Sequence, residues 1–89
     1  MGIDDHSKED RLARLEDQLA KKGITVRSRN DDVIVVVNGH GKLVSVEIDP
    51  KAVRNIRTSK LEITVTETIK SARAKAVQLR ELALRRLEG

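Results

Sequence analysis

Residues 37–50 decide the fold, and they read Val-Asn-Gly-His-Gly-Lys-Leu-Val-Ser-Val-Glu-Ile-Asp-Pro. Asn38-Gly39 predicts a tight hairpin, because both residues tolerate the positive φ angles that such turns use. Gly41 gives the backbone additional conformational freedom where the chain leaves the turn. A strand is therefore expected on each side of these residues.

The residues after the turn predict one strand and then the start of a helix. Val44, Val46 and Ile48 alternate with polar residues, which is the period of two of a half-buried strand. Asp49 and Pro50 fit the N-cap and first position of a helix, because Asp offers an acceptor and Pro lacks an amide that would be unpaired there. The sheet should end at this point.

The rest of the chain completes an α+β order of helix, three antiparallel strands and long C-terminal helix. Residues 1–6 are expected to be a loose tail, and residues 7–89 a single domain. Ser7 begins a helix with a leucine stripe, and Gly23 ends it. Further strands are expected over 24–29 and 33–37, where the second strand is aliphatic on both faces. Either the first helix or a second copy of the chain must then cover its other face.

The final helix is expected over residues 60–88, where a Ser59/Glu62 capping box precedes an uninterrupted stretch. At ~1.5 Å per residue it spans about 43 Å, roughly twice the ~17 to 23 Å of the sheet. An apolar stripe continues into the overhang, so a homodimer is expected, with the folding of the first helix onto the stripe as the alternative. The candidate dimer interface is Val65, Ile69, Ala72, Ala76, Leu79, Ala83 and Leu87, together with Val35.

Charge is concentrated in the C-terminal part of the chain. The 89 residues contain 18 Lys and Arg against 14 Asp and Glu, while residues 51–89 alone contain ten against four. Such asymmetry favours a surface that faces a polyanion, although basic surface helices are also common for solvation alone. No Phe, Tyr or Trp is present to stack unpaired bases, so duplex DNA bound through its phosphates is favoured. The candidate DNA contacts are Arg73, Arg80, Lys75, Arg86, Lys70, Arg54 and Arg57.

The hairpin and the Ile48-Asp49-Pro50 sequence, between an aliphatic strand and a long Ala- and Leu-striped helix, resemble the YbaB/EbfC family of bacterial nucleoid-associated proteins. The resemblance covers residues 7 to 88. It implies a dimeric α/β protein that coats or bridges DNA with little sequence preference, in the cytoplasm on the nucleoid. It does not supply individual DNA-binding residues.

Two features depart from that family pattern. The first helix is short and lacks a Met- and Gln-rich opening, and Arg29-Asn30-Asp31-Asp32 replaces a Gly-rich turn. These departures leave open an alternative function, a dimeric protein-interaction or secretion-accessory module that has lost or altered DNA binding.

Catalysis is not expected. His6 and His40 are isolated from each other, there is no cysteine, and Asp31-Asp32 is better explained as turn chemistry than as a pair of catalytic carboxylates. No catalytic residue, metal, cofactor or small-molecule substrate is therefore predicted, and no apolar run approaches the ~20 residues of a membrane span.

Overall fold

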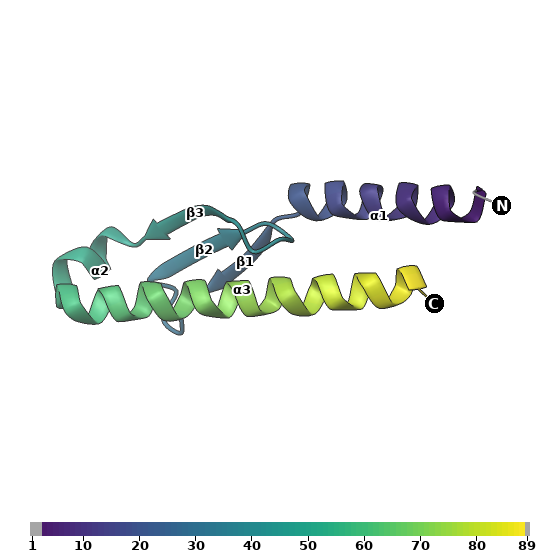
Figure 1. Ribbon diagram of the computed structural model, residues 1–89. Coiled ribbons are helices and arrows are strands. Elements are labelled where there is room, and N and C mark those ends of the chain that lie inside the picture. Colours follow the sequence, from purple (N-terminus) through teal and green to yellow (C-terminus); the bar gives the residue numbers. More distant parts are fainter. Residues whose placement is uncertain (1–2, 89) are drawn as a thin grey trace.

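The computed structural model describes residues 3–88, with side chains from residue 7 onward. Its elements are α1 (Ile3–Lys21), β1 (Ile24–Arg27), β2 (Val33–Val37), β3 (Leu43–Ile48), α2 (Pro50–Asn55) and α3 (Thr58–Glu88). The predicted order of helix, three-stranded antiparallel sheet and long C-terminal helix is confirmed. The molecule is elongated, with extents of 64 × 17 × 16 Å, because α1 and the end of α3 project from the sheet side by side (Figure 1). Among the described helices none is long and apolar enough to cross a membrane.

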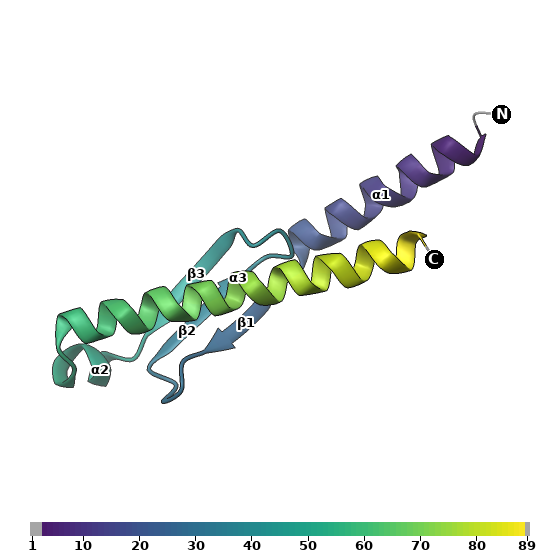
Figure 2. The same cartoon turned by 60° about the horizontal axis from the view of Figure 1, so that its bottom comes forward.

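The sheet has the order β1-β2-β3, and one of its faces forms the core with α3. Val35 pairs with Val26 on β1 and with Val46 on β3, so these three side chains lie on the same face. α3 packs mainly on β1 and β2 (Figure 2). The fully enclosed side chains are Val33, Val35, Val37, Ala72 and Ala76. Small alanines on α3 let the helix approach the valines closely.

The opposite face of the sheet is not covered by α1. Ile34 and Val36 alternate with the core valines and are partly exposed there. Figures 1 and 2 both place α1 beyond the end of the sheet, next to the second half of α3. Of the two expected covers for this face, the first helix is therefore ruled out within the subunit.

The hairpin is present, but its predicted backbone geometry is wrong. Neither Asn38 nor Gly39 has a positive φ; the positive value belongs to Gly41, at +80°. The Gly41 amide donates to the Asn38 carbonyl at 2.9 Å, and the Asn38 amide donates to the Lys42 carbonyl at 2.9 Å. This is a three-residue loop that ends in a left-handed glycine, one of the common hairpin connections. The Asn38 side chain fixes it by accepting from the amides of His40 and Lys42.

Of the three helices, one begins where the sequence predicted and two begin elsewhere. Asp49 caps α2 as predicted, since its carboxylate accepts the Lys51 amide at 2.9 Å and Pro50 follows it. α3 begins at Thr58, so Ser59 lies within the first turn instead of capping the helix. α1 begins at Ile3 instead of Ser7, which places four residues of the expected tail in the helix, while residues 1 and 2 lie outside the described part.

Candidate nucleic-acid interface

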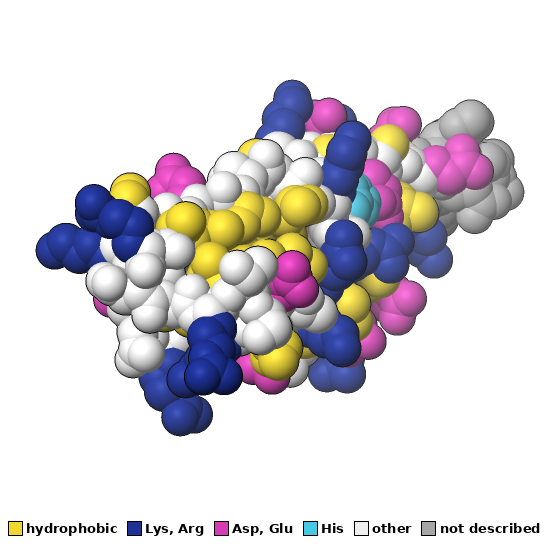
Figure 3. All heavy atoms as spheres, turned by 90° about the vertical axis from the view of Figure 1, so that its left-hand side faces the viewer, with side chains coloured by type: hydrophobic (Ala, Val, Ile, Leu, Met, Phe, Trp, Pro, Cys, Tyr) yellow, Lys and Arg dark blue, Asp and Glu magenta, His cyan; other side chains and the backbone are white. Residues whose placement is uncertain are grey.

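The seven predicted DNA contacts lie at two places on the molecule. Arg54 and Arg57 are exposed at the α2 end, and the other five follow α3 from its middle to its last turn. Lys70, Arg73, Lys75 and Arg86 are exposed, whereas Arg80 is partly buried. Figure 3 looks onto the α2 end and shows Lys and Arg side chains grouped on both sides of a band of hydrophobic surface.

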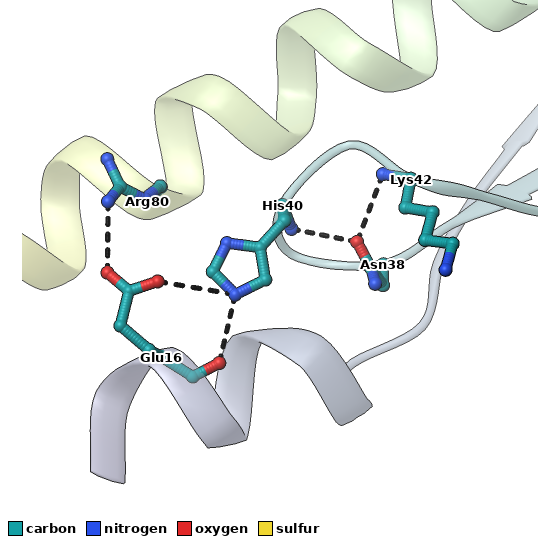
Figure 4. A network of polar contacts seen from close by, with 5 residues as sticks. All are labelled: Glu16, Asn38, His40, Lys42 and Arg80. Carbon is teal, nitrogen blue, oxygen red and sulfur yellow. Dashed lines mark hydrogen bonds and ion pairs between the residues drawn. The ribbon is translucent and has the colours of Figure 1, made fainter. Parts of the chain in front are cut away.

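Arg80 is held by α1. Its Nη2 lies 2.9 Å from Oε1 of Glu16, in an ion pair between α3 and α1. The other carboxylate oxygen of Glu16 lies 3.3 Å from Nε2 of His40, which is also 2.9 Å from the Glu16 backbone carbonyl. Glu16 thus connects α1 to both α3 and the hairpin loop (Figure 4). A residue predicted as a leading DNA contact therefore already has a carboxylate partner within the subunit.

Arg73 also contacts its own hairpin. Its Nε donates to the Gly41 carbonyl at 3.3 Å, while the residue remains exposed. By contrast, Lys70, Lys75 and Arg86 have no ion-pair partner within 4.0 Å among the described residues. The same holds for Arg54 and Arg57 at the α2 end, so these five cations are freely presented to a polyanion.

The joint between α1 and the hairpin is a feature that sequence reasoning missed. The Gly39 amide donates to the Leu19 carbonyl at 2.7 Å, and Leu19 is only 3% exposed. A Cβ built on Gly39 would lie 2.7 Å from that carbonyl oxygen and 2.8 Å from the Leu19 Cα. Gly39 is therefore needed for a close approach of two backbones, although the sequence suggested a need for turn flexibility. The leucine stripe on α1 was the available signal for Leu19; nothing in the sequence signalled Glu16.

The predicted interface stripe divides into two parts. Ala72 and Ala76 on α3, and Val35 on β2, are at most 1% exposed because they face one another in the subunit's own core. The members that keep exposed surface are Val65, Ile69, Leu79, Ala83 and Leu87. Leu87 lines an open crevice between α1 and α3, together with Leu12 and Leu84.

β3 carries apolar surface that the subunit leaves open. It is an edge strand of the sheet, and Leu43, Val44 and Ile48 are 40%, 62% and 36% exposed. Val44 is the extra residue at an irregularity opposite Val36 and Val37, which turns its side chain out of the regular alternation. An exposed edge strand with apolar side chains is a surface on which another chain can pair or pack.

A groove of about 650 Å³ lies between the β1–β2 turn and the first half of α3, lined by side chains of both charges, including Arg27, Lys60 and Glu67. Among the described residues, no group of three His, Asp or Glu side chains is placed to hold a metal ion.

The comparisons with known proteins agree with the architecture. The model of the YbaB/EbfC DNA-binding family matches residues 6–89. A crystal structure of the uncharacterized protein HP0035 from Helicobacter pylori superimposes with a TM-score of 0.83 at 19% sequence identity, over 94% of this chain and 88% of that chain. At this identity the similarity speaks for the fold alone. No curated protein matches the chain.

Proposed function

The chain belongs to the YbaB/EbfC DNA-binding family, and on that premise we propose that it binds duplex DNA as a nucleoid-associated homodimer with little sequence specificity. The observation that carries the proposal is the set of exposed cations along α3, in which Lys75 and Arg86 form a row on one flank of the helix. The proposed location is the bacterial nucleoid.

The spacing of this row suits the phosphate backbone better than base edges. Lys75 and Arg86 lie on one flank of α3, eleven residues apart, which is about 17 Å along a helix at ~1.5 Å per residue. Duplex DNA presents roughly ten phosphates over that length, at one charge per ~1.7 Å of axis. Phosphates accept cations at many spacings and carry no sequence information, so binding through Lys75 and Arg86 would be nearly independent of sequence.

A second copy of the chain is the proposed cover for β3 and its neighbourhood. The edge strand exposes Val44 and Leu43, and Val65 and Ile69 on α3 are only partly covered by the subunit. The chain has no aromatic residue with which to enlarge its small core, so burial of this surface would add stability. Two subunits would also present the cationic row of α3 twice, which raises affinity without new types of contact.

DNA binding is tested by titrating two labelled duplexes of unrelated sequence with the purified chain between 50 and 200 mM salt. We expect similar affinity for both duplexes and a linear fall of log affinity with log salt, with a slope of about −0.9 per phosphate contact. Lys75→Gln with Arg86→Gln should weaken binding. The slope of log affinity against log salt should become less steep by up to about 2 for each subunit that contacts the DNA. Glu67→Gln with Glu88→Gln makes the same kind of amide substitution on α3 but removes negative charge, so it should bind DNA at least as tightly as the unmodified chain. Absence of binding at 50 mM salt would refute the function.

The dimer is tested by Val44→Glu, which places a charge on the exposed part of β3. Because Val44 is 62% exposed, the subunit should fold normally while the proposed interface is disrupted. Val77→Glu is the matched control, since Val77 is 56% exposed on α3. Sedimentation should show a dimer for the unmodified chain and for the control, and a folded monomer for Val44→Glu. A dimer that survives Val44→Glu would place the interface elsewhere.

A further inference from the structure

Arg80 differs from the other candidate DNA contacts on α3 because it already forms an ion pair with a carboxylate of the same subunit. Arg73 and Arg80 are seven residues apart, so they lie on the same side of α3, about 10 Å from each other. Both could face one DNA backbone. Yet the Arg80 guanidinium is paired at 2.9 Å with Glu16, the residue that also contacts His40 in the hairpin loop.

We propose that Glu16 is an internal competitor for DNA phosphate: its carboxylate holds the Arg80 guanidinium, and DNA must displace it before Arg80 can bind a phosphate. The inference rests on the proposed DNA-binding function and adds a regulatory contact to the same surface. A carboxylate and a phosphate are alternative anionic partners for the planar donors of arginine.

The position of the pair allows such an exchange. The side chains of Glu16 and Arg80 are 35% and 43% exposed, so water and a polyanion can reach both groups. Exposed pairs of this kind are weak, and their loss is expected to change an affinity by roughly two- to fivefold. Because Glu16 belongs to α1, displacement would also remove one of the contacts that hold α1 against α3 and the hairpin. DNA binding through Arg80 is thus coupled to the packing of α1 against α3 and the hairpin.

The test compares two variants that remove the same charge. Glu16→Gln removes the competitor, and Glu81→Gln removes a carboxylate next to Arg80 in sequence that has no ion-pair partner among the described residues. In a salt-dependent titration of a duplex, Glu16→Gln should bind roughly two- to fivefold more tightly than the unmodified chain, and more tightly than Glu81→Gln. Its salt slope should be steeper by about 0.9 for each phosphate that Arg80 gains.

A second comparison shows whether the gain passes through Arg80. In an Arg80→Gln background, Glu16→Gln should give no gain over Arg80→Gln alone. An equal gain in Glu81→Gln or in the Arg80→Gln background would overturn the inference while leaving DNA binding intact. Failure of the unmodified chain to bind any duplex would instead overturn the proposed function, and this inference with it.

Discussion

The molecule has two regions that are held together by different forces. The sheet body, which consists of the three strands and residues 58–76 of α3, contains the enclosed valines and alanines. The arm, which consists of α1 and residues 77–88 of α3, has only Leu19 as a fully buried side chain among its described residues. All three ion pairs found in the described part of the chain include a residue of α1.

This contrast separates what stabilises the fold from what can respond to a ligand. Burial of apolar surface is insensitive to moderate salt, whereas the stabilisation from ion pairs on an exposed surface falls as the salt concentration rises. The sheet body should therefore keep its stability when the solvent or a polyanion competes for charges. The arm should loosen under the same conditions, because Glu16 makes both ion pairs that join α1 to α3 and to the hairpin.

The largest expected effect is in the sheet body. Val35→Ala removes two methyl groups from a side chain that is 0% exposed, and it leaves a cavity against α3. We expect a loss of about 2 kcal/mol or more in the free energy of unfolding, measured by urea denaturation. Val77→Ala makes the same chemical change at a side chain that is 56% exposed, and it should stay within about 0.5 kcal/mol. Similar losses in both variants would mean that the sheet body is not the main source of stability.

The next effect is at the joint between the regions. Gly39→Ala introduces a Cβ within 2.8 Å of the Leu19 backbone, which is too close, so the end of α1 must move. We expect a cost of about 1 to 3 kcal/mol that is confined to the arm. In hydrogen exchange, amides of α1 should lose protection while those of β2 keep it.

Gly23→Ala is the matched control for the joint. A Cβ on Gly23 would lie 3.8 Å from Val36 Cγ1, an ordinary contact, and Gly23 has no positive φ. Its exchange pattern should match that of the unmodified chain. Uniform loss of protection over the whole chain in Gly39→Ala would show that the arm and the sheet body unfold as one unit.

Most of the sheet body was predictable because its determinants are local. The alternation of Val44, Val46 and Ile48 predicted β3, and Asp49-Pro50 predicted the start of α2, because strand periodicity and helix capping act over a few residues. The predicted alternation is broken at Val44, the extra residue at the irregularity, which is 62% exposed. The hairpin was located correctly, but the residue with positive φ was not, since Asn38-Gly39 also fits the commoner two-residue turn.

The arm was predicted less well because its contacts connect residues that are far apart in the sequence. Glu16 meets His40 and Arg80, which are 24 and 64 residues away. An exposed Glu on a helix has many possible partners, and no spacing rule selects one in another element. The prediction of Arg80 as a DNA contact missed its carboxylate partner because Glu16 lies on a different helix, α1.

A smaller effect is expected at His40, the hairpin residue that contacts Glu16. His40→Ala removes the contacts of Nε2 with the Glu16 carbonyl and carboxylate, both near the protein surface. We expect α1 to lose about 0.5 to 1 kcal/mol of protection in hydrogen exchange, with no change in β2. Lys42→Ala, in the same loop, is the control, because only the Lys42 backbone joins the hairpin hydrogen bonds. If Lys42→Ala loosened α1 equally, the loop as a whole would be responsible.

The smallest effect belongs to an ion pair that lies within α1. Lys21 and Asp17 are 3.1 Å apart and one helical turn from each other, but their side chains are 77% and 64% exposed. Asp precedes Lys and Lys21 is in the last turn, so both the pair and the helix dipole favour this arrangement by only a few tenths of a kcal/mol. Lys21→Gln should therefore reduce protection of the last turn of α1 slightly at 50 mM salt and not at 1 M. Lys22→Gln, just beyond the helix, should leave the protection of this turn unchanged at both salt concentrations. A loss that persists at 1 M salt would mean that Lys21 acts through the packing of its aliphatic stem, and that charge contributes less to the arm than its ion pairs suggest.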